Sequence, residues 1–319
     1  MPVRDVSAIS TALPWQQEQW AHLEAQLSQQ QLPHALILCG PQYSGKARLA
    51  LALARLLLCH KPEGGHNCGQ CHACDLSMTG GHGDFRWLEP EEGSRVTKVD
   101  QVRQLVEFST KTASLGRRKL IVLSPAESMT IAAANALLKS LEEPSPETYI
   151  ILVCHRLHGL PATIRSRCQI LKLLMPNREA SLKWLNLRTG NTSDSEKSLR
   201  LAQGRALLAE QLYQDASMDY VEAVQVALRA LSSGTGSVQE LAAIMVDEPL
   251  EDVLSQLYGC LQRLLLKMNR AKLTTPSTRA IYSLSDEVLR LQGAVYSGAN
   301  PNRQLLVDAL SARFEMVLT

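Results

Sequence analysis

The sequence predicts an α/β domain built on a parallel sheet, followed by two helical domains. In the first half, short and wholly apolar segments alternate with amphipathic helical segments, the pattern of a parallel sheet covered on both faces. Beyond residues 174–176 strand signals disappear and helical patterns continue to the end. We therefore expect an α/β domain over 1–175, a small helical lid over 176–214 and an all-α domain over 215–319.

The expected elements follow from apolar periodicity and from turn residues such as Gly40 and Pro41. In the α/β domain, helices are predicted at 16–31, 46–58, 99–112 and 132–141, and strands at 35–39, 119–123 and 149–154. Residues 59–74, rich in Gly, His and Cys, are predicted to be an irregular insertion. The lid is predicted to be helical over 178–213, and the last domain to hold helices over 218–318 with breaks near 232–237, 274–277 and 298–301.

Composition excludes several classes of protein. Of the 319 residues, 45% are hydrophobic and 4% aromatic, which suits a helical globular protein and excludes collagen-like or disordered chains. The chain has 33 Lys and Arg and 31 Asp and Glu, and its net charge of +2 gives no global argument for nucleic-acid or membrane binding. There is no signal-peptide pattern and no apolar run near the ~20 residues of a membrane helix, so we expect a cytoplasmic protein without membrane contact.

Residues 40–46, Gly-Pro-Gln-Tyr-Ser-Gly-Lys, fit the first seven positions of a phosphate-binding loop. In such loops the glycines (Gly40 and Gly45) let main-chain N–H groups surround phosphate oxygens, and the lysine (Lys46) neutralises them. The position between a strand and a helix supports this interpretation. The alternative is a glycine turn followed by a chance lysine.

Two positions that would handle magnesium are missing. The eighth position of the loop is Ala47, where a Ser or Thr hydroxyl should coordinate Mg²⁺. After the strand at 119–123 an acidic pair is expected, but the chain has Ser124 and Pro125, with Glu127 as the nearest carboxylate. The sequence therefore predicts a nucleotide-binding fold that does not hydrolyse nucleotide, and it leaves ATP binding itself doubtful.

Four of the eight cysteines, Cys59, Cys68, Cys71 and Cys74, lie within sixteen residues. Four thiolates from a short folded-back segment are the ligands of a structural, tetrahedral Zn²⁺ site, which leaves no open position for catalysis. An iron–sulfur cluster, a redox dithiol and reduced surface thiols are the alternatives. A neighbouring histidine is a further candidate ligand in place of one cysteine, and the four such residues are His60, His66, His72 and His82.

Three features together resemble the bacterial clamp-loader AAA+ subunits: the phosphate loop with a cysteine-rich insertion after its helix, the segment Ala-Ala-Asn-Ala-Leu-Leu-Lys-Ser-Leu-Glu-Glu-Pro at 133–144, and the Ser-Arg-Cys tripeptide at 166–168. The resemblance covers residues 32–174 strongly and the rest weakly. It implies an AAA+ (RecA-like) domain, a lid and a helical collar in a ring. The neighbours would be ATP-binding gamma or tau subunits and a delta subunit.

In this role the chain would be a non-hydrolysing, stator-like accessory to a replicative DNA polymerase, without a polymerase active site. It would help to load a sliding clamp, with weak contact to primer-template DNA.

Arg167 falls on the family's arginine finger, which reaches ATP held by the neighbouring subunit. The alternatives are that Arg167 caps a strand or pairs on the surface, or that Arg165 has the role. A nucleotide-sensing arginine is expected three residues after Gly204, where the chain has Leu207, and Arg205 is out of register.

Other readings stay open at this point. The active ATPase motor (gamma- or tau-like) is the alternative within the clamp loader, and a zinc-dependent nucleic-acid-binding module is a second rival. Basic residues could face DNA or could simply form a solvated surface: Lys98, Arg103, Lys111, Arg117, Arg118 and Lys119. Likewise a set of leucines in the last domain serves either oligomerisation or the domain's own core: Leu254, Leu257, Leu261, Leu264 and Leu265.

Overall fold

A computed structural model describes residues 7–91, 94–233, 235–246, 248–267, 275–296 and 298–318. The chain divides into two compact units, one that ends at residue 187 and also includes 205–207, and one formed by 188–204 and the residues from 208 onward. The predicted domain boundaries at 175 and 214 stay predictions. Among the described residues, no helix combines the length and the apolarity needed to cross a membrane.

The first unit is built on a five-stranded sheet, and every neighbouring pair of strands is parallel, as the sequence predicts. The spatial order is β2-β3-β4-β1-β5. The strands are β1 (Ala35–Cys39), β2 (Phe85–Leu88), β3 (Lys119–Leu123), β4 (Thr148–Cys154) and β5 (Gln169–Lys172). Central β1, β3 and β4 are almost wholly buried, because helices cover both of their faces.

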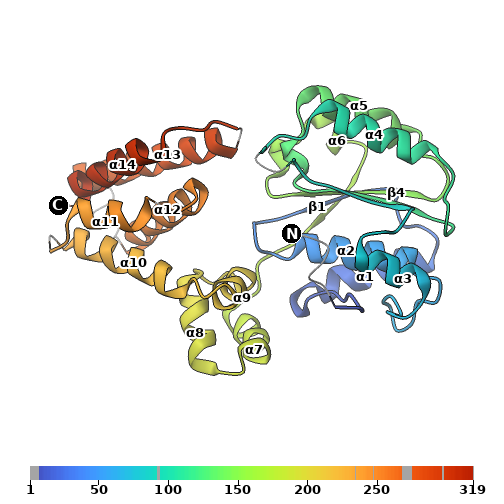
Figure 1. Cartoon of the computed structure of the whole chain (residues 1–319), viewed down its shortest axis with the longest axis horizontal. Coiled ribbons are helices and arrows are strands. Elements are labelled where there is room, and N and C mark those ends of the chain that lie inside the picture. The colour runs from blue at the N-terminus through green and yellow to red at the C-terminus, as the bar shows by residue number, and fades with distance from the viewer. Residues whose placement is uncertain are drawn as a thin grey trace. The chain divides into compact units, whose positions relative to one another are not determined.

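Helices cover the sheet on both sides, with α1, α2 and α3 on one face and α4, α5 and α6 on the other (Figure 1). Alternate residues of β1 serve the two faces: Leu36 and Leu38 pack in one apolar core and Ile37 in the other. The helices are α1 (Gln17–Ser28), α2 (Lys46–Leu58), α3 (His72–Thr79), α4 (Val99–Thr110), α5 (Ile131–Glu142) and α6 (Ala162–Arg165).

The region after the sheet is helical, as predicted. Three shorter helices come first: α7 (Arg178–Thr189), α8 (Thr192–Leu201) and α9 (Ala206–Gln214). Five more helices follow: α10 (Met218–Ser232), α11 (Val238–Met245), α12 (Leu250–Lys267), α13 (Pro276–Tyr296) and α14 (Arg303–Leu318). The predicted breaks at 232–237 and 298–301 fall between helices. The third predicted break, at 274–277, begins at residue 274, which lies outside the described residues.

The core of the second unit forms between α10, α11, α12, α13 and α14. Leu254, Leu257 and Leu261 of α12 are at most 1% exposed within this core, and Leu264 and Leu265 pack against it. For these leucines the core interpretation is therefore the one observed.

Candidate phosphate loop, cysteine cluster and exposed arginine

The phosphate loop lies at the carboxyl end of β1 and leads into α2. Gly45 is the N-cap of α2 with φ +90°, a left-handed conformation that favours glycine. Space is also limited, because a Cβ on Gly45 would lie 2.4 Å from Cδ1 of Leu13, and one on Gly40 would lie 2.2 Å from the carbonyl oxygen of Leu173. Both glycines are thus required by geometry, and the chance-turn alternative does not explain this packing.

Lys46 is turned onto its own loop. Its Nζ donates hydrogen bonds to the carbonyl oxygens of Gly40 (2.8 Å) and Pro41 (2.5 Å) and approaches Oγ of Ser44 at 3.4 Å. The residue is 3% exposed, and burial lowers the pKa of its ammonium to about 8, although the nearby Glu127 carboxylate opposes this shift. The charge that would meet a phosphate is therefore satisfied by main-chain oxygens.

No carboxylate pair follows β3, and the one nearby carboxylate has another partner. Oε1 of Glu127 accepts a hydrogen bond of 2.8 Å from the main-chain N–H of His155, directly after β4. Burial lowers the pKa of His155 to about 4, and the charges of Lys46 and Arg156 lower it further. The positions after β3 and β4 thus place Glu127 and a neutral His155 near Lys46, whereas magnesium-dependent hydrolysis uses a hydroxyl and acidic ligands.

Arg205 is out of register for the nucleotide-sensing arginine that the sequence predicts, yet it lies beside the phosphate loop. Its guanidinium carbon lies 5.7 Å from the ring centroid of Tyr43 in the phosphate loop. Such a cation–π contact joins two segments far apart in the sequence, and no local pattern at 202–207 indicates it. Arg205, although out of register in the sequence, is therefore a side chain from this segment that contacts the loop.

The four cysteines come together although they span sixteen residues. Their Sγ atoms all lie within 4.8 Å of one another, and the Cys59–Cys71 and Cys68–Cys74 pairs are each 3.9 Å apart. Four sulfurs at about 2.3 Å from one tetrahedral zinc ion would be separated by roughly 3.8 Å. Two of the separations match this value, so the cluster fits a single metal ion with at most small shifts of the sulfurs.

Local folding explains how these ligands converge. Cys59 follows the end of α2, Cys68 and Cys71 lie in the irregular segment, and Cys74 sits in the first turn of α3. The helix from His72 onward corrects the prediction that the insertion is irregular as far as residue 74. Among the described residues, the candidate metal group contains the four thiols and no histidine.

Arg167 follows α6 and has an exposed side chain, 35% accessible. Its Nε and Nη2 lie 2.6 and 2.5 Å from Oε1 of Glu142 at the end of α5. Nη1 donates to the carbonyl oxygen of Thr163 (3.0 Å) and to Oγ of Ser166 (3.2 Å). The guanidinium therefore lies at the surface, held by an exposed carboxylate, where such an ion pair contributes little stability.

Comparison with known proteins shows which family the chain belongs to. A family model described as "DNA polymerase III, delta subunit" matches residues 15–177. Two full-length relatives are DNA polymerase III subunit delta′ of Pseudomonas aeruginosa, 36% identical over 93% of this chain and 95% of the relative, and that of Escherichia coli, 31% identical over 96% of both. The chain belongs to the DNA polymerase III subunit delta′ family. A solved structure with the same AAA+ fold is a gamma subunit-related protein of Thermotoga maritima, with a TM-score of 0.54 and 18% identity, covering 94% of this chain and 100% of that one.

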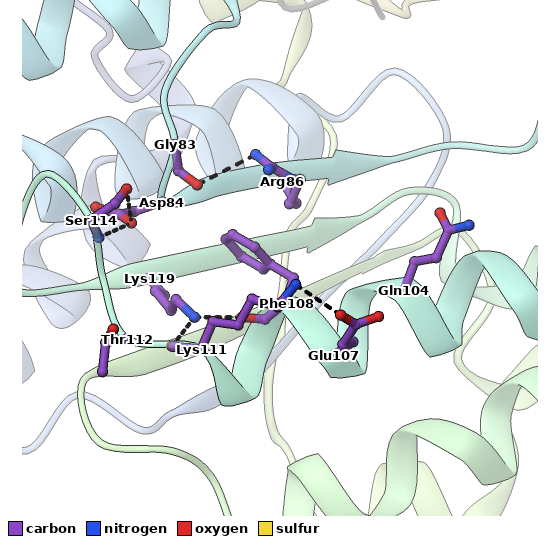
Figure 2. A pocket seen from close by; sticks show the side chains of 10 residues that line it. All are labelled: Gly83, Asp84, Arg86, Gln104, Glu107, Phe108, Lys111, Thr112, Ser114 and Lys119. Carbon is purple, nitrogen blue, oxygen red and sulfur yellow. Dashed lines mark hydrogen bonds and ion pairs between the residues drawn. The ribbon is translucent and has the colours of Figure 1, made fainter.

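This delta′ family member also has a pocket of about 370 Å³ at the amino ends of β2 and β3 (Figure 2). Its charged groups already have partners. The ammonium of Lys119 donates to the carbonyl oxygens of Phe108 and Lys111 at the end of α4, and Lys119 is 3% exposed. Lys119 is therefore a structural cap of α4, and it does not belong to a basic surface that could face DNA.

Asp84 closes the other side of this pocket and is 1% exposed. It accepts four hydrogen bonds: from the N–H (2.6 Å) and hydroxyl (2.9 Å) of Ser114, and from the N–H groups of Leu115 (2.8 Å) and Gly116 (3.1 Å). Burial alone would raise the pKa of Asp84, but these hydrogen bonds outweigh it and hold the pKa below its ordinary value. The charged residues that line the pocket therefore belong to a hydrogen-bonded network that stabilises the fold.

Proposed function

We propose that this chain is a non-hydrolysing, stator-like subunit of a bacterial DNA polymerase III clamp loader, acting in the cytoplasm. The observation that carries the proposal is Ala47, which removes the magnesium ligand from an otherwise complete phosphate loop. Membership in the delta′ family and the absence of an acidic pair after β3 support it. An active ATPase motor is the alternative, and no feature described above favours it.

The inferred partners follow from the family. The chain would sit in a hetero-oligomeric ring beside ATP-binding gamma or tau subunits and a delta subunit, with a lid (176–214) and a collar (215–319) that mediates assembly. Primer-template DNA and the sliding clamp would be reached through the complex. Its own contribution to catalysis would be in trans, since Lys46 is occupied by carbonyl oxygens of its own loop.

Arg167 is the residue that we infer to act in trans. Its guanidinium is exposed and held by Glu142, Thr163 and Ser166, all on the same surface region. A fork of N–H donors suits the oxygens of a phosphate, and arginine fingers contribute about 10³-fold or more to turnover at the site that they complete. To reach a neighbour's ATP, the guanidinium must exchange its contact with Glu142 for phosphate oxygens.

The cysteine cluster is inferred to be a structural zinc site. Cys59, Cys68, Cys71 and Cys74 would hold the ion as thiolates, and a closed shell of four sulfurs supplies folding energy and no reaction chemistry. The sulfur separations that fit one ion support this assignment. Metal analysis of chain purified without chelator tests it, because an absence of zinc would contradict the assignment.

The test of the main proposal is ATP turnover by the chain alone and by the complex reconstituted with gamma or tau and delta subunits, clamp and primed DNA. We expect none from the isolated chain. Arg167→Ala should remove the contribution of one ATP site, so that total turnover falls by about that site's share while the complex stays assembled by gel filtration. Arg165→Ala is the matched control, because it removes a neighbouring arginine and should leave turnover near wild type.

Two results would overturn this assignment. Turnover by the isolated chain would mean that the loop works despite Ala47, and the motor alternative would replace the proposal. Unchanged turnover in an intact Arg167→Ala complex would remove the trans-acting role. If Arg165→Ala slowed turnover instead, the finger would be Arg165.

A further inference from the structure

Residues 7–16, the N-terminal strap, run between the cysteine module (residues 59–79) and the phosphate loop. At the module, Asn67 is fully buried and holds the strap by two hydrogen bonds. Its Oδ1 accepts from the N–H of Ser10 (2.8 Å), and its Nδ2 donates to the carbonyl oxygen of Ala8 (2.8 Å). The same Nδ2 lies 3.5 Å from Sγ of Cys74. One side chain therefore connects a candidate metal ligand to the strap.

Arg55 of α2 makes a second joint between the same parts. Its Nη1 donates to the carbonyl oxygen of Ser7 (2.8 Å) and to Oγ of Ser10 (2.7 Å), and its Nη2 donates to the carbonyl oxygen of Ser77 in α3 (3.4 Å). The side chain is 1% exposed. A buried guanidinium is costly unless it is hydrogen-bonded, so these contacts fix the strap against both helices.

The loop between Cys68 and Cys71 lies directly on the strap. Gly69 has φ +70°, and a Cβ there would lie 2.9 Å from Cγ1 of Ile9 and 3.4 Å from the main chain of Ala8. This close approach is independent of the hydrogen bonds of Asn67 and Arg55. A shift of the module's irregular segment must therefore move residues 8–10.

The other end of the strap lies on the phosphate loop. Nε1 of Trp15 and Nε2 of Gln16 both donate to the carbonyl oxygen of Ser44, at 3.1 and 3.0 Å. Oε1 of Gln16 accepts from the N–H of Leu13 (3.1 Å), and Leu13 is the side chain that fills the space beside Gly45. The conformation of residues 44 and 45 thus depends on where residues 13–16 lie.

We propose that the strap links the two sites, so that metal binding by the cysteine module holds the phosphate loop in its conformation. Asn67 is the positioning residue at the joint. The inference rests on the proposed metal site, because the segment 59–71 is largely irregular and needs the ion to fix its shape. Without the metal, Asn67 is released and the contacts of the strap with Ser44 loosen.

Hydrogen exchange of the full-length chain, read by mass spectrometry, tests this link with a readout other than activity. Chelation with EDTA should speed exchange on the order of tenfold in peptides covering 7–16 and 41–46. In the first peptide the N–H of Ser10 loses its acceptor on Asn67, and in the second the loop opens more often once Trp15 and Gln16 no longer hold the carbonyl of Ser44. The peptide covering 114–120, at the opposite end of the sheet, should not change.

Two variants separate the link from the metal. Asn67→Ala should speed exchange of both peptides by a similar factor in zinc-loaded protein. Ser10→Ala removes the Oγ that accepts from Arg55 while the Ser10 N–H still binds Asn67, so it should speed exchange of both peptides by a smaller factor with the module unaltered. Gln70→Ala is the matched control, because Gln70 is an exposed residue of the same loop. Zinc content is measured for each sample.

Exchange that accelerates only within 59–79 on chelation would overturn the link. So would unchanged exchange at 7–16 and 41–46 in Ser10→Ala. If the purified chain holds no zinc, the proposed metal site fails by itself, and the role of metal in the link fails with it. Asn67→Ala and Ser10→Ala then decide whether the module holds the strap: faster exchange at 41–46 supports this, and wild-type exchange refutes it.

Discussion

Replacing Asp84 tests how much the network at the amino ends of β2 and β3 contributes to stability. Asp84→Ala removes the acceptor of four hydrogen bonds and leaves the main-chain N–H groups of Ser114, Leu115 and Gly116 without it. Each buried donor left unpaired costs about 1–3 kcal/mol, and water entering the adjacent pocket restores part of this. We expect a loss of about 3–5 kcal/mol in the free energy of unfolding.

Urea unfolding of the full-length chain, followed by a probe of the first unit such as tryptophan fluorescence, measures this change. The matched control is Asp100→Ala, because the side chain of Asp100 is 78% exposed and its ion pair with Arg103 lies at the surface. This control should change stability by less than ~0.5 kcal/mol. A cost below ~1 kcal/mol for Asp84→Ala would refute the reasoning, since the network would then be replaceable by water.

The pH dependence of the same residue has a defined sign. Because the pKa of Asp84 is lower in the folded chain than the ordinary 3.8, the folded state favours its ionised form. Its stabilising contribution is therefore present above pH 3.8 and is lost as the pH falls through the folded-state pKa. Asp84→Asn should lack this part of the acid sensitivity, which denaturant curves at a series of acid pH values would show.

Three further predictions concern other sites. Cys68→Ser should lower zinc content from about one ion per chain to near zero, measured by metal analysis, and wild-type content in the variant would contradict the four-thiolate site. Gly45→Ala should lower the free energy of unfolding by at least about 2 kcal/mol, because of its positive φ and the contact of the new Cβ with Leu13. Gly80→Ala is the control: Gly80 also has a positive φ but open space around it, so this variant measures the cost of the backbone strain alone. Glu210→Ala should cost about 1–2 kcal/mol in thermal unfolding, because the buried Glu210 carboxylate lies 2.6 Å from Nε of Arg188, and an unchanged Tm would refute this.

Central elements of the fold were predictable because their sequence pattern is dominated by burial. The predicted bounds of β1, α2 and β3 agree with the observed ones, since these segments are almost wholly apolar. The edge strands β2 and β5 were not predicted. Arg86 in β2 and Gln169 in β5 interrupt the apolar pattern, and an edge strand needs less burial to form.

The candidate sites divide in the same way. Local spacing predicted the four cysteines, whose Sγ atoms come together, and a glycine loop between β1 and α2, where the structure has one; phosphate binding by this loop stays a prediction. The contact of Arg205 with Tyr43 and the joints at Asn67 and Arg55 join residues that are distant in sequence. No periodicity or motif encodes such pairs, because each depends on how the whole unit packs. Lys119 is the opposite case: its charge suggested a surface position, whereas its side chain is buried in the structure.

The cap on α4 means that the length of this helix is encoded outside the helix. Lys119, the first residue of β3, binds carbonyl oxygens eleven and eight residues earlier in the chain. The sequence at 108–112 has no glycine or proline to end the helix, and its pattern predicts a helix that continues to residue 112. Inserting or deleting residues in the turn at 112–118 would therefore do more than alter a loop: it would move the ammonium away from α4 and let the helix end fray or extend.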